Sequence, residues 1–331
     1  MAKPILLLAD KIDNIAIIDL VNYIRSLNGH GAARQALVIG GRTDSTGYTN
    51  DVTLYRFDDT TVGAVRNTAG DNRANHSCSS NNTEMLVIGG RSNNTTWLTA
   101  VNKIHFDNTA TTTLTNTLSQ TRERGLATGT LNHIIYMSGV RSTGAISTLI
   151  ENIRYDDAGS AIFNNGVTTG RTNAHIAGNG TDAIIQGGLD SGSNNINAGE
   201  KIRLDDTIAS RVLVNTLSIN RSSGSATTEG RSFIVMGGLS PDVSTSVSSV
   251  ENVTFDDLTA SITYSNSLLA QRFSQVAVTD SMYALVIGGK DNAGVRLNTI
   301  DKIKLDDSTT STASSNNLLV AKNLHAAESG F

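Results

Sequence analysis

The chain has 331 residues, a formal net charge of −4 and a pI near 5.9, with 17% charged and 5% aromatic residues. This balance predicts no nucleic-acid partner, and the absence of an apolar run of about 18 residues predicts no membrane insertion. The one cysteine, Cys78, excludes an intramolecular disulfide framework. Short apolar runs between Ser, Thr, Asn and Gly are typical of an all-β chain with many turns.

Residues 1–30 differ from the rest of the chain, and we interpret them as an N-terminal arm. Ile5 to Leu8 predicts a short strand, and the charges at Asp10, Lys11 and Asp13 argue against a signal peptide. Asp13 to Leu27 predicts an amphipathic helix with Asp13 as its N-cap. Its apolar stripe is Ile17, Leu20, Val21, Ile24 and Leu27. The stripe either packs on one end of the domain or docks the domain onto a partner.

Residues 31–331 repeat one plan six times. The first mark is Gly-Gly after a short apolar run, with steps of 49, 49, 49, 50 and 51 residues between successive copies. These copies are Gly40-Gly41, Gly89-Gly90, Ser138-Gly139, Gly187-Gly188, Gly237-Gly238 and Gly288-Gly289. The second mark is an acidic pair, at Asp58-Asp59, Asp107-Asn108, Asp156-Asp157, Asp205-Asp206, Asp256-Asp257 and Asp306-Asp307. A period near 50 is typical of propeller blades.

The third mark is an Asn followed six residues later by a basic residue. The asparagines are Asn67, Asn116, Asn165, Asn215, Asn266 and Asn316. The basic residues are Arg73, Arg122, Arg171, Arg221, Arg272 and Lys322. Because three marks recur in one order, the sequence predicts six four-stranded blades in a single domain.

Each repeat also predicts its own strands. The run before Gly-Gly is continuously apolar and β-branched, as in a strand buried on both faces. The next segment alternates and ends at the acidic pair, which predicts a turn. A polar outer strand follows, and the basic residue opens the innermost strand of the next blade. Lys322 to Glu328 then supplies the innermost strand of blade one, pairing with Ala33 to Gly41 and closing the ring.

This plan resembles the kelch repeat. In some units a His follows the basic residue closely, as in Arg73 with His76, Arg171 with His175 and Lys322 with His325. The tryptophan that kelch repeats carry in strand four is absent, and Leu, Ile or Val takes its place. The resemblance covers about residues 32 to 331. It is that of a divergent six-bladed kelch-like β-propeller, similar to kelch-like structural proteins of bacteriophage virions.

The recurring polar residues have structural and functional interpretations. The basic residues could surround one mouth of the channel and hold an anion, or each could pair with an acid such as Glu151, Glu200, Glu251 or Asp301. The acidic pairs recur at one turn, which favours a structural role over metal binding or acid/base catalysis. The histidines show no metal-ligand spacing, so we expect no metal.

No catalytic motif emerges from the sequence. Phosphate-binding loops, HExxH and a nucleophile elbow are absent, so we expect no enzyme activity and no cofactor. The kelch resemblance implies that the loops between strands two and three share a partner-binding face with the loops that lead into strand one. In this sequence the loops between strands two and three differ most between the units. Tyr48 and Trp97 in these loops, with Arg42 and Arg91, are the candidate contacts for a sugar or protein.

Two functions follow as hypotheses. The first is a non-enzymatic structural or adhesion protein in the virion of a tailed bacteriophage. There the arm would bind other tail, neck or capsid proteins, and the loop face a protein or glycan of the host surface. The alternative is a free-standing propeller of bacterial or viral origin that binds a glycan or a protein.

Overall fold

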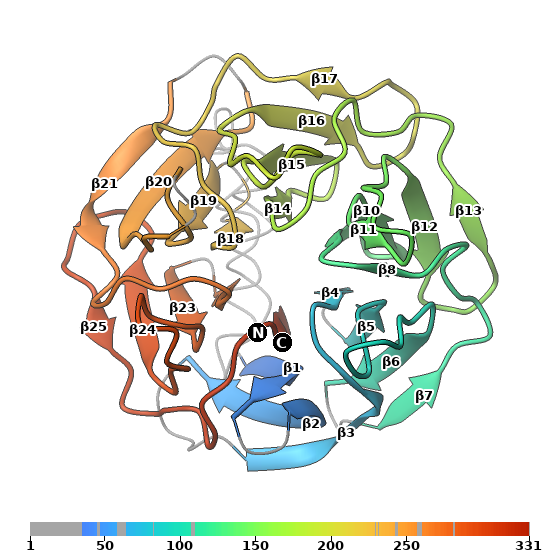
Figure 1. Cartoon of the computed structure of the whole chain (residues 1–331), viewed down its shortest axis with the longest axis horizontal. Coiled ribbons are helices and arrows are strands. Elements are labelled where there is room, and N and C mark those ends of the chain that lie inside the picture. The colour runs from blue at the N-terminus through green and yellow to red at the C-terminus, as the bar shows by residue number, and fades with distance from the viewer. Residues whose placement is uncertain are drawn as a thin grey trace, which may run out of the picture.

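The protein is described by a computed structural model at residues 35–44, 47–57, 64–81, 83–106, 110–228, 230, 232–241, 244–256, 260–280 and 282–330. Within these ranges every regular element is a strand, and the chain forms an all-β propeller of six blades (Figure 1). The predicted strand and helix of residues 1–30 lie outside the described residues.

Each blade is a four-stranded antiparallel sheet, whose strands follow one another from the channel outward. Blade 1 is β26 (Ala326–Gly330), β1 (Gln35–Thr43), β2 (Gly47–Arg56) and β3 (Ala64–Arg73). Blade 2 is β4 (Ser77–Ser80), β5 (Glu84–Ile88), β6 (Val101–His105) and β7 (Thr111–Thr113). Blade 3 is β9 (Leu126–Gly129), β10 (His133–Met137), β12 (Ile150–Arg154) and β13 (Ser160–Ile162).

The other three blades have the same order from the innermost strand to the outermost. Blade 4 is β14 (His175–Gly178), β15 (Asp182–Gln186), β16 (Gly199–Arg203) and β17 (Arg211–Val212). Blade 5 is β18 (Ser225–Thr228), β19 (Ser232–Met236), β20 (Ser249–Thr254) and β21 (Ile262–Ser267). Blade 6 is β22 (Val276–Thr279), β23 (Tyr283–Ile287), β24 (Ile300–Lys304) and β25 (Thr312–Ala313). A small ribbon joins β8 (Arg122–Glu123) to β11 (Val140–Arg141).

The two ends of the described chain meet in blade 1. β26 runs antiparallel to β1, with Ala327 opposite Val38 and Gly330 opposite Gln35. The pairing strand is residues 326–330, where the sequence predicted 322–328. The difference arises at Leu324, whose φ of +56° is incompatible with a strand. The chain therefore turns there before β26 begins.

The same left-handed turn precedes every innermost strand. Each of the residues two positions after the basic mark has a φ between +53° and +57°; they are Asn75, Arg124, Asn173, Ser223, Ser274 and Leu324. Neighbouring members are hydrogen-bonded through the backbone, as from Arg124 N to Asn75 O (2.8 Å) and from Asn75 N to Leu324 O (3.0 Å). The basic residue thus precedes the innermost strand by a turn and does not open it.

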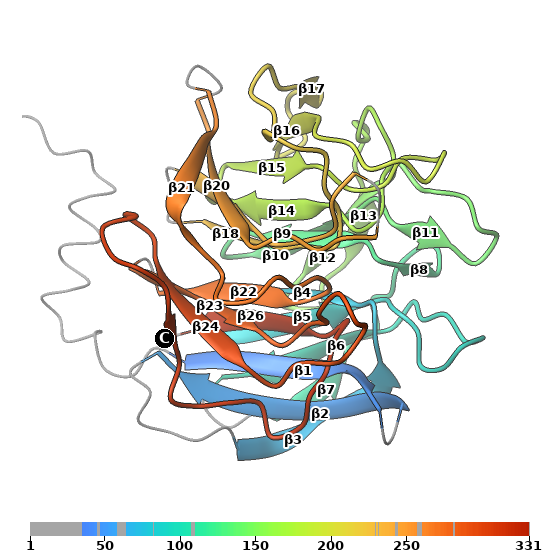
Figure 2. The same cartoon turned by 60° about the vertical axis from the view of Figure 1, so that its left-hand side comes forward.

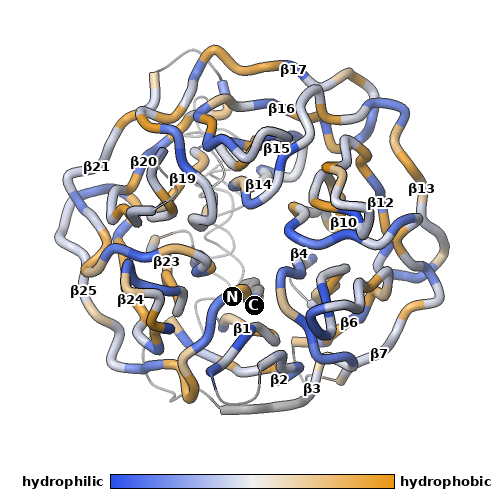
Figure 3. The backbone as a smooth tube through the Cα atoms, viewed as in Figure 1, coloured by the Kyte–Doolittle hydropathy of each residue, from blue (hydrophilic) through white to orange (hydrophobic). Residues whose placement is uncertain are grey.

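The cores lie between the blades. Alternate residues of the second strand face opposite neighbours: Leu37 and Ile39 pack toward blade 2, whereas Ala36 and Val38 pack toward blade 6. All four side chains are fully buried. Figure 3 shows apolar segments on middle strands such as β15, β19 and β23. The prediction of a strand buried on both faces is confirmed.

Blade 1 departs from the other blades at its connection between strands two and three. The sequence placed Arg42 to Asn50 in a loop, but Arg42 lies on β1 and pairs with Tyr48 on β2. The connection is as long as in blade 4, since 13 positions separate Ile39 from its partner Val52 and 13 separate Gln186 from its partner Gly199. The pairing differs: β1 and β2 continue to Thr43 and Gly47, whereas the segment after β15 makes the isolated bridge between Leu189 and Asn195.

The second glycine of each Gly-Gly allows close packing against the segment that leads into the innermost strand. A Cβ at Gly188, whose φ is +94°, would lie 2.6 Å from the Cβ of Ala174. Gly180 has a φ of +88° but open space around it. We expect Gly180→Ala to cost about 1–2 kcal/mol from backbone strain and Gly188→Ala about 1–3 kcal/mol more from the clash. Urea unfolding measures both, and equal losses would contradict the packing role.

Candidate ligand-binding face and closure cleft

Two of the repeat marks bind each other across the blade boundaries. In the repeats where the structure describes it, at Asp157, Asp206 and Asp307, the second acid of the pair has a positive φ and accepts hydrogen bonds from the Asn segment of the preceding blade. The Asp206 carboxylate accepts from Asn164 N (2.8 Å), Asn165 N (3.1 Å) and Asn165 Nδ2 (3.0 Å). Asp157 with Asn116 and Asp307 with Asn266 repeat this clamp. At these three boundaries the clamp gives both marks a structural role.

The basic mark binds the first residue of Gly-Gly and a buried acid. Arg171 donates from Nη1 to the carbonyls of Gly187 (3.2 Å) and Ala198 (2.7 Å), and from Nη2 to Glu200 Oε1 (2.6 Å). The other Glu200 oxygen accepts from Thr168 N at 2.6 Å. Both charged side chains are 1% exposed. Arg122 with Glu151, Arg221 with Glu251 and Arg272 with Asp301 repeat the pair. These arginines are therefore engaged inside the blades and do not surround the channel mouth.

The two boundaries of blade 1 carry different pairs. Arg73 donates to Asn102, which stands where blades 3 to 6 have an acid, and its Nη2 lies 3.7 Å from the Asp71 carboxylate. Burial lowers the pKa of Arg73 to about 10, against the opposing effect of the Asp71 charge. At the boundary between blades 6 and 1, where the ring closes and which we call the closing boundary, Lys322 Nζ lies 2.6 Å from Asp51 Oδ2. Blade 1 thus lacks an Arg–Glu pair on both sides.

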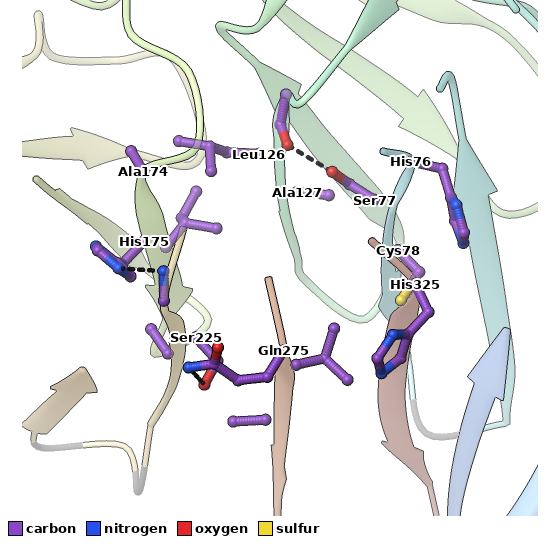
Figure 4. A pocket seen from close by; sticks show the side chains of 16 residues that line it. His76, Ser77, Cys78, Leu126, Ala127, Ala174, His175, Ser225, Gln275 and His325 are labelled. Atoms are coloured by element: carbon purple, nitrogen blue, oxygen red, sulfur yellow. Dashed lines mark hydrogen bonds between the residues drawn. The ribbon is translucent and has the colours of Figure 1, made fainter. Parts of the chain in front are cut away.

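The central channel is lined by the residues at the start of the innermost strands, with His76, Cys78 and His325 on one side and His175 on the other (Figure 4). Its cavity measures about 170 Å³. His175 Nδ1 donates to Gln186 O (3.0 Å), because its Nε2 accepts from Gly224 N (3.1 Å). His325 Nε2 lies 3.1 Å from Ile287 O, and Gln275 Nε2 donates to Met236 O at the equivalent position. Through these hydrogen bonds the side chains connect the backbones of neighbouring blades.

Burial lowers the pKa of His175 and His325 to about 3, and the pKa of His76 also falls well below 6.5. The folded chain keeps them neutral, whereas the unfolded chain protonates them below pH 6.5. Stability is therefore fully present above that pH and falls as the pH drops from 6.5 toward 3. We expect about 1.4 kcal/mol per pH unit for each histidine.

The chain supplies a matched control for this pH dependence, because Gln275 holds the same carbonyl contact without titrating. His325→Gln should reduce the slope of the unfolding free energy between pH 6.5 and 4 by about 1.4 kcal/mol per unit. Urea unfolding at a series of pH values measures the slope. An unchanged slope in this variant would mean that His325 is not held neutral in the folded chain, as its buried contact with the Ile287 carbonyl indicates.

The four predicted contact residues, Arg42, Tyr48, Arg91 and Trp97, come together on the loop face. The Arg91 guanidinium stacks 4.0 Å above the Trp97 ring, and Arg42 lies 5.4 Å from the Tyr48 ring. Asn94 joins the two pairs, because its Oδ1 accepts from Tyr48 Oη (3.1 Å) and its carbonyl accepts from Arg91 Nη1 (3.2 Å). The four residues therefore belong to one connected surface.

This surface continues beyond the predicted residues in both directions. Arg91 Nη2 donates to Glu123 Oε1 at 2.6 Å, and Arg124 Nε lies 3.6 Å from the same oxygen. On the other side Arg296 pairs with Asp44 and donates to Asn323 Oδ1 (2.8 Å). We call the set Arg42, Asp44, Tyr48, Arg91, Asn94, Trp97, Glu123, Arg124, Arg296 and Asn323 the basic arc.

The charges of the basic arc do not cancel. Four arginines and two carboxylates give +2, in a chain whose formal charge is −4. Arg42 also lowers the pKa of Arg296, after the larger effect of burial, because the two cations lie close together. The sequence did not indicate Arg124 and Arg296 as members. Arg124 stands at the repeated left-handed turn before the innermost strand, and Arg296 holds in blade 6 the repeat position of Trp97.

A cleft at the closing boundary adjoins the arc at Tyr48. It measures about 480 Å³ and is lined by Tyr48, Asp51, Tyr55, Asn72, Leu319, Lys322 and their neighbours. That volume falls within the range of roughly 300–1,000 Å³ that ligand sites take. Burial raises the pKa of Tyr55 to about 12. Burial alone would raise the pKa of Asp51, but the charge and hydrogen bond of Lys322 outweigh it and lower that pKa.

Comparisons with known proteins leave the family open. Neither a protein-family model nor a curated protein matches the chain. In the part of the chain that the structure describes, no group of three or more His, Cys, Asp or Glu side chains could hold a metal, and no helix could cross a membrane. The six-bladed propeller is shown by the pairing of the strands, and the resemblance to kelch repeats stays a prediction.

Proposed function

We propose that this protein is a non-enzymatic adhesion propeller that binds an acidic surface polysaccharide through its loop face. The observation that carries the proposal is the basic arc, in which arginine and aromatic side chains from separate blades form one connected surface of charge +2. Arginine, tyrosine and tryptophan are the residues enriched where binding energy concentrates. A charged polymer also gains from steering toward a locally positive surface on an acidic protein.

The binding site that we propose involves no catalytic residue and no cofactor. The guanidinium groups of Arg91 and Arg42 would pair with carboxylate or sulfate groups of the polymer. The Trp97 and Tyr48 rings would contact sugar rings or hold the guanidinium planes in place. Glu123 and Asp44 fix the positions of the neighbouring arginines.

The test is binding of the full chain to immobilised alginate, hyaluronan and heparin, with neutral dextran for comparison. We expect binding to at least one acidic polymer, at least tenfold weaker at 200 mM than at 50 mM salt, because exposed charges are screened. Arg91→Ala and Trp97→Ala should each weaken it at least fivefold. Arg203→Ala is the matched control, since this arginine lies at the opposite end of its blade, beside Asp182 and Asp205. Equal losses in all three variants, or no binding to any acidic polymer, would contradict the proposal.

We further propose the virion of a tailed bacteriophage as the setting, with residues 1–30 anchoring the propeller to tail, neck or capsid proteins. The support is the apolar stripe of residues 17–27 in the sequence, together with the kelch-like repeat plan. Mass spectrometry of purified particles and of soluble lysate from the source culture tests this setting. Enrichment of the chain in particles is the expected result. Its confinement to the lysate would exclude the virion and favour a free-standing binding propeller.

A further inference from the structure

The closing boundary differs from the other blade boundaries in what covers it. In blade 4, the loop between β15 and β16 folds back, so that Ala198 O accepts from Arg171 and Asn197 O accepts from Leu217 N. In blade 1, the β1–β2 hairpin replaces that loop. The space beside Asp51 and Lys322 is therefore open, and it forms the 480 Å³ cleft (Figure 2 shows β1 and β2 side by side).

Among the described residues, Lys322, the basic residue at this boundary, also makes fewer side-chain hydrogen bonds than Arg171 makes in blade 4. Arg171 directs its donors to two carbonyls and a carboxylate. For the Lys322 ammonium, Asp51 Oδ2 is the hydrogen-bond partner found among the described residues. An ammonium group has three donors, and the side chain of Lys322 is 3% exposed. Donors that are buried at the wall of a cleft favour a ligand that brings an acceptor.

The ion pair presents an acceptor and a donor side by side. The Asp51 side chain keeps 28% of its surface exposed, and its carboxylate lies 2.6 Å from the Lys322 ammonium. Two adjacent hydroxyl groups match this arrangement, because each hydroxyl can both donate and accept. Because the pair is neutral as a whole, it gives no preference for a charged ligand.

The rest of the cleft supplies apolar contacts. Leu319 and Val320 at its rim are 53% and 49% exposed, and the Tyr48 and Tyr55 rings form part of its wall. A tyrosine ring offers an apolar face beside a polar tip. A pyranose combines hydroxyl groups along its edge with C–H groups on its faces, so it is complementary to both parts of the cleft.

We propose that the closure cleft binds a neutral hexose through a pair of adjacent hydroxyl groups held by Asp51 and Lys322. This inference rests on the proposed function, since Tyr48 belongs to both surfaces and the hexose would be one sugar of the polymer held along the basic arc.

The test uses saturation-transfer NMR and calorimetry of the full chain with the methyl glycosides of glucose, galactose and mannose. Leu319→Trp should fill the cleft without touching the ion pair. Leu269→Trp is the matched control, because Leu269 occupies the equivalent position, three residues before Arg272, and is 55% exposed. We expect at least one glycoside to bind and Leu319→Trp to weaken it at least tenfold, with Leu269→Trp unchanged.

A second variant tests the role of the ammonium. Lys322→Arg restores the basic residue of the other five boundaries, so the fold should be kept while the larger guanidinium occupies the cleft, and glycoside binding should fall at least tenfold. Absence of any glycoside signal, or equal binding in Leu319→Trp, overturns the hexose site. Since the polysaccharide assay depends on Arg91 and Trp97, failure of the cleft and failure of the basic arc are distinguishable.

Discussion

Deleting residues 326–331 should remove most of the stability of the propeller. β26 is the innermost strand of blade 1, and five of its residues pair with β1. At roughly 1 kcal/mol for each hydrogen bond, the lost ladder amounts to roughly 5 kcal/mol, against a typical total of about 5–15 kcal/mol. The deletion also exposes the edge of β1, where Leu37, Val38 and Ile39 are fully buried.

Thermal and urea unfolding of the truncated chain measure this loss. A synthetic peptide of residues 322–330, added in trans, should restore part of the stability, because it can occupy the vacant edge. A peptide of the same composition in scrambled order is the control. If the truncated chain unfolded at the same midpoint as the full chain, β26 would not be the strand that closes the ring.

Glu200→Ala should destabilise the protein by about 3–5 kcal/mol. The change leaves the Arg171 cation buried without its carboxylate, and it also removes the acceptor for the N–H groups of Thr168 and Thr169. The double variant Arg171→Met, Glu200→Leu should lose less than Glu200→Ala, since no unpaired buried charge remains. The midpoints of urea unfolding compare the two.

At blade 2 the buried arginine already lacks an acid, so the acid can be added there instead of removed. Asn102 occupies the position of the acid and binds Arg73. Asn102→Asp changes the shape little and supplies a carboxylate, so we expect a gain of about 1–2 kcal/mol. A loss in this variant, or a neutral Glu200→Ala, would show that the buried pairs do not hold the blades as their geometry indicates.

The blade count could be predicted from the sequence because the repeat marks are bonding partners of one another. Asp206 is hydrogen-bonded to Asn165, and Arg171 is hydrogen-bonded to Gly187 and Glu200. Because each residue type requires its partner, each mark recurs with the period of the blades. The start of β26 could not be predicted in the same way. The left-handed turn before it falls on Leu324, a residue type that gives no hint of a positive φ.

The candidate site was predictable only in part. Tyr48 and Trp97 were identifiable as the aromatic residues of the variable connections. Arg296 lies six residues after Lys290, as Trp97 lies six residues after Arg91, so the repeat does place it at the same position. Neither Arg296 nor Arg124 is aromatic, however, and the sequence does not show that the two side chains reach the surface around Arg91.

The closure cleft depends on the extended hairpin between β1 and β2, whose length in the chain equals that of the blade 4 connection. Its one signal in the sequence is the position of the acid: Asp51 stands two residues before Thr53, which has the register position of Glu200.

Hydrogen exchange of the full chain, with and without the acidic polymer that it binds best, tests the proposed adhesion site most directly. The basic arc and closure cleft predict protection in residues 91–99, 47–56 and 319–324, with no change in the hairpin turns of the opposite face, such as residues 129–133 and 178–182. Protection centred on those turns, or spread evenly over both faces, would contradict the assignment of the loop face as the binding surface.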